Sequence, residues 1–335
     1  MLKSLASLRF VFAFLVFLHH INVLQDALGH AFFYALSGFI LSYVYAERFT
    51  EQQMSLSRFL KLRLSRLYPL YVLTLLAAVP LSLGFLASNA EQWMLQFVAN
   101  LFMLQSFIPN AEYYFAFNSL GWSISDLFFF YMLFPALLLV FRKYTHRIIY
   151  EVFGLFFLLI LSLMYIVPQE LQHWFFYINP LLRLFDFALG MLLYQLLKKA
   201  SFGRFDSRFT WYEIGSLVLL VILYTSAALF PKVLRYSVYY WLPMLAVIGV
   251  FAQQKGALSK LLSKPVFLFL GNLSFGFYLW HQLILRYARR VVNHFEITMA
   301  DWQFYSLSFI LILLVCYFSY RFFELPMKQK LRSYS

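Results

Sequence analysis

Long runs of apolar residues, most of them uninterrupted by charge, dominate the chain. A helix needs about 20 such residues to cross the hydrocarbon core of a bilayer, and about 17–25 are tolerated. Ten segments meet this requirement: 5–24, 30–46, 67–86, 119–140, 150–167, 175–196, 211–230, 236–252, 266–285 and 303–323. The runs are continuous rather than alternating, which argues against a transmembrane β-barrel. The pattern therefore predicts an all-α polytopic membrane protein with about ten spans.

One further apolar stretch, residues 93–108, is short for a span. It is bounded by polar and helix-breaking residues: Asn89, Glu91, Pro109 and Asn110. We expect it to form a re-entrant or interfacial segment that does not cross the bilayer. No internal repeat or low-complexity tract interrupts the pattern, so residues 1–335 are expected to form a single membrane domain.

The distribution of basic residues gives the orientation. With segment 93–108 not crossing and the N-terminus in the cytoplasm, nineteen of the 27 Lys and Arg residues fall in cytoplasmic segments. These are Lys3, Arg48, Arg58, Lys61, Arg63, Arg66, Arg142, Lys143, Arg147, Lys198, Lys199, Arg204, Arg208, Lys255, Lys260, Lys264, Lys328, Lys330 and Arg332. Only five fall in outer loops: Lys232, Arg235, Arg286, Arg289 and Arg290. Because basic residues in short loops stay in the cytoplasm, both termini are predicted to be cytoplasmic.

Composition excludes several classes of protein. Hydrophobic residues make up 63% of the chain and charged residues 12%, whereas a soluble domain has about 45–50% and about 25%. A net charge of +13 would suggest nucleic acid in a soluble protein, but here the topology explains it, so no nucleic-acid partner is expected. The single cysteine, Cys316, allows no disulfide within the chain. The basic and then apolar N-terminus has no small-residue cleavage site, which indicates a retained first span.

Ionisable side chains within the predicted spans are costly in a bilayer, so each needs a partner or a task. The pair Arg9 and His20 stands eleven positions apart, so the two lie within about 20° of one helix face and about 16 Å apart along it. His19 is turned about 80° from that face. Two interpretations stay open: a paired functional face, or an arginine that snorkels to the interface together with a histidine bonded to a neighbouring carbonyl.

Other ionisable groups sort by depth and spacing. Arg183 and Asp186 are three apart and can meet on one helix face, which favours a structural ion pair. In the ten-span topology, one group falls near the cytoplasmic surface: Arg9, Arg63, Arg66, Arg321 and Glu324. A second group falls in the outer third of the spans: His20, Asp126 and His281. Arginine clusters suit phosphates because the guanidinium donates bidentately, and a histidine suits removal of a proton from an alcohol.

Seven fragments occur in an order that is typical of one family. They are LASLRFVFAFLVFLHH (5–20), FFYALSGFILS (32–42), RLSRLYPLY (63–71), LGWSISDLFFFYMLFP (120–135), RLFDFALG (183–190), LGNLSFGFYLWH (270–281) and FELP (323–326). With these fragments the chain resembles the membrane-bound acyltransferase-3 family of bacterial O-acyltransferases. Asp126 stands where the family usually has Glu. The chain ends soon after the last predicted span, so we expect the form without a C-terminal SGNH esterase-like domain.

The resemblance implies an enzyme of the bacterial inner membrane. Family members move an acyl group, commonly acetyl, from cytoplasmic acyl-CoA to a hydroxyl of a cell-surface glycan, such as lipopolysaccharide, or of its lipid-linked precursor. Arg63 and Arg66, with Arg9, are expected to hold the phosphates of acetyl-CoA or another acyl-CoA. His20 is expected to act as the base, and no metal is expected.

Several roles remain alternatives. Asp126 either orients His20, as a carboxylate orients the histidine of a hydrolytic triad, or is satisfied by Trp122, Ser123 or a helix N-terminus. The donor to the developing oxyanion is Arg9, Trp122 or a backbone amide near Ser37. Three further roles follow: His281 is expected to be a packed, hydrogen-bonded histidine, Glu324 to pair with Arg321 or cap backbone, and Ser37 is a less favoured acyl carrier.

A different class of function also fits buried charges. A transporter or flippase for a lipid-linked glycan or small solute would use Arg, Asp and His for coupling or gating. The absence of two similar halves in the sequence argues against it. A non-catalytic scaffold of a glycan-assembly complex fits the seven fragments least well. Whether the chain forms a homo-oligomer is left open.

Overall fold

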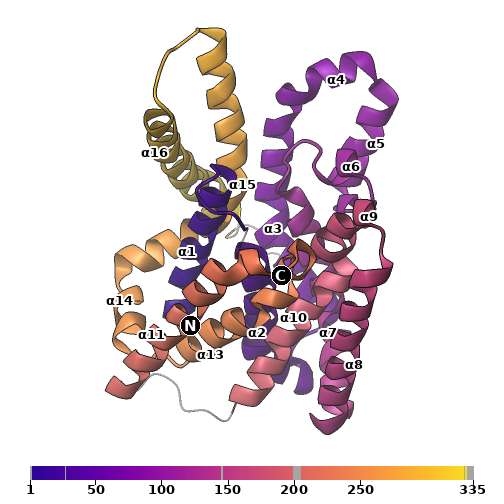
Figure 1. Cartoon of the computed structure of the whole chain (residues 1–335), viewed down its shortest axis with the longest axis vertical. Coiled ribbons are helices and arrows are strands. Elements are labelled where there is room, and N and C mark those ends of the chain that lie inside the picture. Colours follow the sequence, from indigo (N-terminus) through magenta and orange to yellow (C-terminus); the bar gives the residue numbers. More distant parts are fainter. Residues whose placement is uncertain (1, 27, 145, 199–204, 328, 330–335) are drawn as a thin grey trace. The chain divides into compact units, whose positions relative to one another are not determined.

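The computed structural model describes residues 2–26, 28–144, 146–198, 205–327 and 329 (Figure 1). No strand occurs in these residues. In chain order the helices are α1 (Lys3–His20), α2 (Gly29–Thr50), α3 (Leu56–Ala78), η1 (Val79–Ser82), α4 (Leu83–Ser88), α5 (Ala90–Leu101), η2 (Gln105–Phe107), α6 (Ala111–Tyr114), α7 (Gly121–Lys143), α8 (His146–Ile166), α9 (Gln169–His173), η3 (Trp174–Ile178), α10 (Pro180–Leu197), α11 (Ser207–Ser226), η4 (Ala227–Leu229), α12 (Lys232–Arg235), η5 (Val238–Tyr240), α13 (Trp241–Ala252), α14 (Ala257–Leu262), α15 (Pro265–His294), α16 (Asp301–Ser319) and η6 (Tyr320–Glu324). Five basic residues assigned to the cytoplasm from the sequence lie outside the described residues: Lys199, Arg204, Lys328, Lys330 and Arg332.

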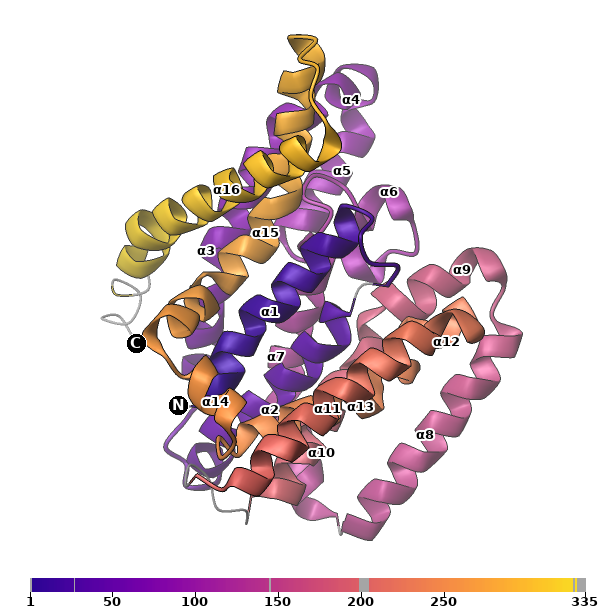
Figure 2. The ribbon, with the colours of Figure 1, turned by 60° about the vertical axis from the view of Figure 1, so that its left-hand side comes forward.

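The helices gather into two compact units, each built from segments that are far apart in the sequence. The first unit comprises Met1–Gly29, Lys61–Ser125 and Leu258–Ser335, and the second comprises His30–Leu60 and Asp126–Ala257. In the first unit α1 packs along α15, and α15 packs along α16 (Figure 2). In the second unit α13 packs against both α10 and α11.

The prediction of an all-α polytopic membrane protein is confirmed. Among the described residues, eight helical stretches are long and apolar enough to cross a bilayer: Lys3–His20, Leu56–Ser88, Gly121–Lys143, Arg147–Ile166, Gln169–Leu197, Ser207–Leu229, Pro265–His294 and Asp301–Met327. The predicted span at 30–46 corresponds to α2, which is not in this set, and the one at 236–252 corresponds to a shorter apolar helix, Val238–Ala252. The total of ten spans therefore stays a prediction.

Two helix ends differ from the positions that hydropathy predicts. Helix α1 ends at His20 rather than near residue 24, because backbone capping and not hydropathy stops it. Helix α15 has 30 residues and ends at His294, nine residues beyond the predicted end at 285. At 1.5 Å per residue α15 is about 45 Å long, which exceeds the roughly 30 Å of a hydrocarbon core. The extra turns carry arginines, which hydropathy excludes from a span but helix propensity favours.

Segment 93–108 forms most of α5, a turn and the short helix η2. Helix α5 starts at the Asn89 side chain, which accepts a hydrogen bond from the Gln92 amide. Its twelve residues span about 18 Å, too little to cross a bilayer. Its end is tied to α3, because the Tyr71 hydroxyl donates to the Asn100 carbonyl over 2.6 Å and the Tyr68 hydroxyl donates to the Leu101 carbonyl over 3.2 Å.

A reporter experiment checks that this segment does not cross. Reporters fused after Ser88 and after Asn110 should lie on the same side of the membrane, because a helix of about 18 Å must return the chain to the side it left. Alkaline phosphatase and fluorescent-protein fusions at both positions measure the side directly. Opposite sides would overturn the orientation of every later span.

Glycines allow helices to cross closely within each unit. A Cβ on Gly190 of α10 would lie 1.8 Å from the Ala35 carbonyl oxygen of α2, and one on Gly38 of α2 would lie 1.9 Å from the Phe187 carbonyl oxygen of α10. In the first unit, a Cβ on Gly271 of α15 would lie 2.3 Å from the Ala6 carbonyl oxygen of α1. Small residues at such crossings bring helix backbones together in membranes. Three of the family fragments thus contain a packing glycine.

Gly190→Ala should destabilise the second unit, because the added methyl meets backbone that cannot rotate away. We expect a loss of about 1–3 kcal/mol, typical of overpacking. Gly154→Ala in α8 is the matched control, since a Cβ there meets nothing within 4 Å. Alanine favours a helix over glycine, so this control should be neutral or stabilising. Thermal unfolding of both variants in detergent measures the difference, and equal melting temperatures would contradict the crossing.

Candidate active site

His20 is held at the last helical position of α1 by the backbone turn that ends this helix. Asn22 follows with φ 60°, a left-handed conformation that Asn adopts more readily than most residues. The Val23 amide donates to the Leu18 carbonyl over 2.9 Å, and the Asn22 amide donates to the His19 carbonyl over 3.0 Å. These two bonds are those of a Schellman motif. Both the end of the helix and the direction of His20 are thereby defined.

His20 pairs with His281 of α15. The His20 Nδ1 lies 3.0 Å from the His281 Nε2, and the His281 Nδ1 lies 3.1 Å from the Phe277 carbonyl oxygen. A carbonyl oxygen can only accept, so the His281 Nδ1 carries the hydrogen, and in the neutral ring Nε2 is then an acceptor. The His20 Nδ1 must therefore donate to it. In the tautomer that these hydrogen bonds set, the His20 Nε2 carries a lone pair rather than a hydrogen. A general base requires this form of the ring.

The surroundings of the pair differ between the two histidines. His281 is fully buried and packs among the rings of Phe17, Phe277 and Tyr278. His20 is only partly buried. The prediction of a packed, hydrogen-bonded His281 agrees with this geometry, but the sequence did not indicate His20 as its partner, because the two residues are 261 positions apart.

The neighbouring His19 is directed elsewhere. Its Nδ1 lies 3.1 Å from the Leu24 carbonyl oxygen, in the turn that follows α1. His19 is thus engaged with local backbone, whereas His20 contacts α15. The angular separation expected from helix geometry accounts for this difference.

A basic pocket lies in the first unit at the other end of α1. It has a volume of about 70 Å³, and its lining includes Arg9, Arg66, Asn272, Tyr320 and Glu324. Arg9 and Arg66 thus line one pocket together with Glu324. Arg63 is half-buried and does not line it. The structure therefore brings together two of the three arginines expected to bind phosphate.

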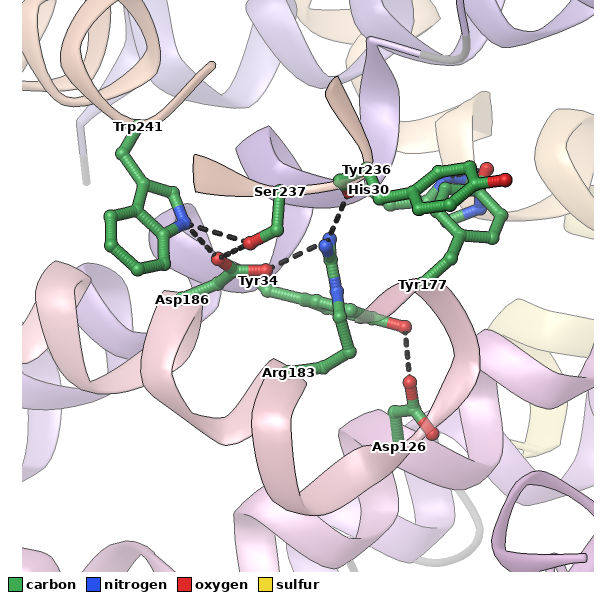
Figure 3. Close-up of polar contacts among 9 residues, drawn as sticks. All are labelled: His30, Tyr34, Asp126, Tyr177, Arg183, Asp186, Tyr236, Ser237 and Trp241. Carbon is green, nitrogen blue, oxygen red and sulfur yellow. Dashed lines mark hydrogen bonds and ion pairs between the residues drawn. The ribbon is translucent and has the colours of Figure 1, made fainter. Parts of the chain in front are cut away.

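A buried ion pair occupies the second unit (Figure 3). The Arg183 Nη2 lies 2.8 Å from the Asp186 Oδ2, with 1% of each side chain exposed. The other carboxylate oxygen accepts hydrogen bonds from the Ser237 hydroxyl, over 2.7 Å, and from the Trp241 indole. The Arg183 Nη1 donates to the Tyr236 carbonyl over 2.7 Å. Helical spacing predicted the pair. The partners that make its burial tolerable come from elsewhere in the chain.

Asp126 is also fully buried, and Tyr34 is its hydrogen-bond donor. The Tyr34 hydroxyl donates to the Asp126 Oδ2 over 2.8 Å, and the Arg183 guanidinium lies 5.1 Å from the centre of the Tyr34 ring (Figure 3). The sequence pattern did not indicate Tyr34, although it stands one helical turn before Gly38 in the same fragment. Orientation of His20 by Asp126 stays a prediction.

The remaining candidates lie in packed surroundings. Trp122 is 2% exposed at the start of α7, and several hydrogen bonds hold this part of the chain to α15. The Ser123 hydroxyl lies 2.7 Å from the Tyr278 hydroxyl, and the side-chain amide of Asn118 donates to the Leu279 carbonyl over 3.0 Å. Ser37 is half-buried beside the packing residue Gly38. The roles of Trp122 and Ser37 stay predictions.

Comparison with known proteins identifies the family. The acyltransferase domain family matches residues 2–321. The chain is 26% identical over 329 residues to the acyltransferase MdmB of Streptomyces mycarofaciens, a match that covers 87% of this chain and 81% of that protein. It is 24% identical over 349 positions to the O-acetyltransferase OatA of Staphylococcus aureus (strain NCTC 8325 / PS 47), a match that covers 98% of this chain but only 57% of OatA.

No solved structure matches this chain. The family match nevertheless runs through both units and includes both partners of the His20–His281 pair. It favours an enzyme over a transporter. The chain therefore belongs to the acyltransferase-3 family of membrane-bound O-acyltransferases.

Proposed function

We propose that this enzyme is an O-acetyltransferase of the bacterial inner membrane, with both termini in the cytoplasm. It moves acetyl, or another acyl group, from cytoplasmic acyl-CoA to a hydroxyl of a cell-surface glycan or its lipid-linked precursor. The observation that carries the proposal is the hydrogen-bonded chain from His20 through His281 to the Phe277 carbonyl. The name of one relative, an O-acetyltransferase, supports transfer to oxygen.

His20 acts as the general base. Its Nε2 takes the proton of the acceptor hydroxyl as the new carbon–oxygen bond forms, and it returns that proton to the departing thiolate as the carbon–sulfur bond breaks. A base positioned in this way contributes about 10²–10⁴-fold to the rate. The imidazolium that forms on His20 keeps its Nδ1–H donated to a neutral acceptor, His281, which stabilises the charge without proton loss.

The tetrahedral oxyanion needs a hydrogen-bond donor of its own. Arg9 and Trp122 are the side-chain candidates, and the backbone near Ser37 is the third. Arg9 stands on the same face of α1 as His20, about 16 Å along the helix. A guanidinium at that distance suits the cytoplasmic end of an extended substrate better than the reacting carbonyl.

The basic pocket is the proposed binding site for the phosphates of the donor. Arg9 and Arg66 supply forked N–H donors that match phosphate oxygens. Arg63 stands one helical turn before Arg66 on α3, outside the lining of the pocket, and is proposed to give the same phosphates a further forked donor. Because α1 connects this pocket to His20, the long pantetheine arm of acyl-CoA can bring its thioester, an activated acyl group, toward the base.

Arg63→Lys and Arg66→Lys should weaken binding of the donor while topology is unchanged. Lysine keeps the charge of the cytoplasmic segment but loses the bidentate contact. We expect about a tenfold rise in the Kd for acetyl-CoA, the equivalent of one charge-assisted hydrogen bond. Titration calorimetry on the purified protein measures the Kd, with Lys61→Arg as a charge-neutral control in the same segment. Normal binding by both lysine variants would reject the assignment.

A labelling experiment tests the function as a whole. Sealed inside-out vesicles from cells with and without this protein are incubated with radiolabelled acetyl-CoA, and the glycan fraction is extracted. We expect label in the glycan only when the protein is present, and we expect mild base to release it, as an ester requires. Right-side-out vesicles should stay unlabelled, because the proposed donor site is cytoplasmic. Equal labelling in cells that lack the protein would refute the proposal.

A further inference from the structure

The far end of α15 carries three exposed arginines: Arg286, Arg289 and Arg290. They lie on the turns that extend past the predicted span, before the chain turns into α16 (Figure 1). The Arg286 Nη1 donates to the Phe117 carbonyl over 2.5 Å, and the Arg290 Nη2 donates to the Leu81 carbonyl over 2.9 Å. The Arg289 guanidinium lies 4.0 Å from the centre of the Phe304 ring.

These contacts leave the positive charge of the cluster uncompensated. None of the ion pairs between described residues involves Arg286, Arg289 or Arg290. Residues three and four apart on a helix are neighbours, so the three guanidinium groups repel one another. A neutral donor such as Asn could make the bonds to backbone carbonyls. Anchoring alone therefore does not explain three arginines.

Topology makes the cluster more unusual. In the predicted orientation only five basic residues face outward, and three of them are these arginines. Basic residues next to a span favour the cytoplasmic side, so this placement acts against the orientation that the rest of the chain specifies. Each guanidinium group has five N–H donors. The hydrogen bonds to backbone carbonyls use one donor of Arg286 and two of Arg290.

We propose that Arg286, Arg289 and Arg290 bind the phosphate of the acceptor, which is then a glycan carried on a polyisoprenyl phosphate or diphosphate. This inference rests on the proposed function and narrows its acceptor. Arg286 and Arg290 stand five and nine residues beyond His281 on α15, about 7.5 Å and 13.5 Å along the helix axis. A phosphate bound there keeps the attached sugar within reach of His20, which is hydrogen-bonded to His281.

The binding test uses farnesyl diphosphate as the phosphate-bearing probe and farnesol as the neutral one, on full-length protein in phosphatidylcholine nanodiscs. We expect Arg289→Gln and Arg286→Gln each to raise the Kd for farnesyl diphosphate about tenfold, as loss of a charge-assisted contact does. Binding of farnesol should not change. Lys232→Gln, which removes another exposed outer cation, is the matched control and should bind like the wild type.

Further measurements distinguish acceptor binding from misfolding of a variant and from binding of lipid headgroups. Each variant must bind acetyl-CoA like the wild type, which shows that it is folded, and Arg286→Lys should restore part of the affinity. Equal Kd values for all proteins, or an equal loss in Lys232→Gln, would overturn the proposal. If phosphatidylglycerol nanodiscs abolish farnesyl diphosphate binding by the wild type, the cluster binds lipid headgroups and the proposal is wrong. The vesicle labelling decides the proposed function independently, because it does not depend on these arginines being an acceptor site.

Discussion

His20→Ala should abolish acetyl transfer, with a loss of about 10²–10⁴-fold in the rate of the chemical step. Its Nε2 is the nitrogen that carries a lone pair in the tautomer that the hydrogen-bonded chain sets. Donor binding and expression should stay near the wild-type level, because a base acts on the transition state and not on the bound donor. Initial rates of label transfer in inside-out vesicles, together with the Kd for acetyl-CoA, measure both quantities.

His19→Ala is the matched control for this variant. The two histidines are adjacent, but His19 contacts the Leu24 carbonyl and not α15. Its loss removes one local hydrogen bond and should leave much of the activity in place. Substantial transfer by His20→Ala, or a complete loss in His19→Ala alone, would show that the mechanism is wrong.

Substitution of His281 should produce the second large effect, through the position of His20. His281→Phe keeps an aromatic ring in the packed site but removes the acceptor for the His20 Nδ1–H. His20 can then rotate or carry its hydrogen on Nε2 instead of Nδ1. We expect kcat to fall about 10–100-fold, by analogy with loss of a group that orients a metal-bound histidine. The KM for acetyl-CoA should change little.

His281→Gln separates positioning from packing. The Gln side-chain oxygen can accept from the His20 Nδ1–H, so this variant should recover part of the lost kcat. A purely structural role predicts the reverse order, because Phe fits an apolar site better than Gln. Steady-state kinetics of both variants decide between the two roles, and a His281→Phe enzyme with normal kcat would remove His281 from the mechanism.

Local chemistry determined much of this protein. Continuous apolar runs predict membrane helices because every backbone polar group in lipid must be satisfied within its own segment. Helical periodicity alone placed Arg9 and His20 on one face of α1 and turned His19 away from it. The Arg183–Asp186 ion pair followed from a spacing of three residues. Each of these features depends on residues within a few helical turns of one another, which a sequence displays directly.

Only the tertiary structure decided which residues complete the sites. His20 and His281 are separated by 261 residues and Tyr34 and Asp126 by 92, and nothing in a helix period indicates which of many buried polar groups will meet. The crossings at Gly38 and Gly190 depend likewise on how two distant helices approach. Hydropathy also predicted too early an end for α15. It measures the free-energy cost of placing side chains in lipid, whereas a helix can continue beyond the bilayer into water. Helix identity is local, whereas the hydrogen-bond partner of a buried side chain is fixed by packing between segments.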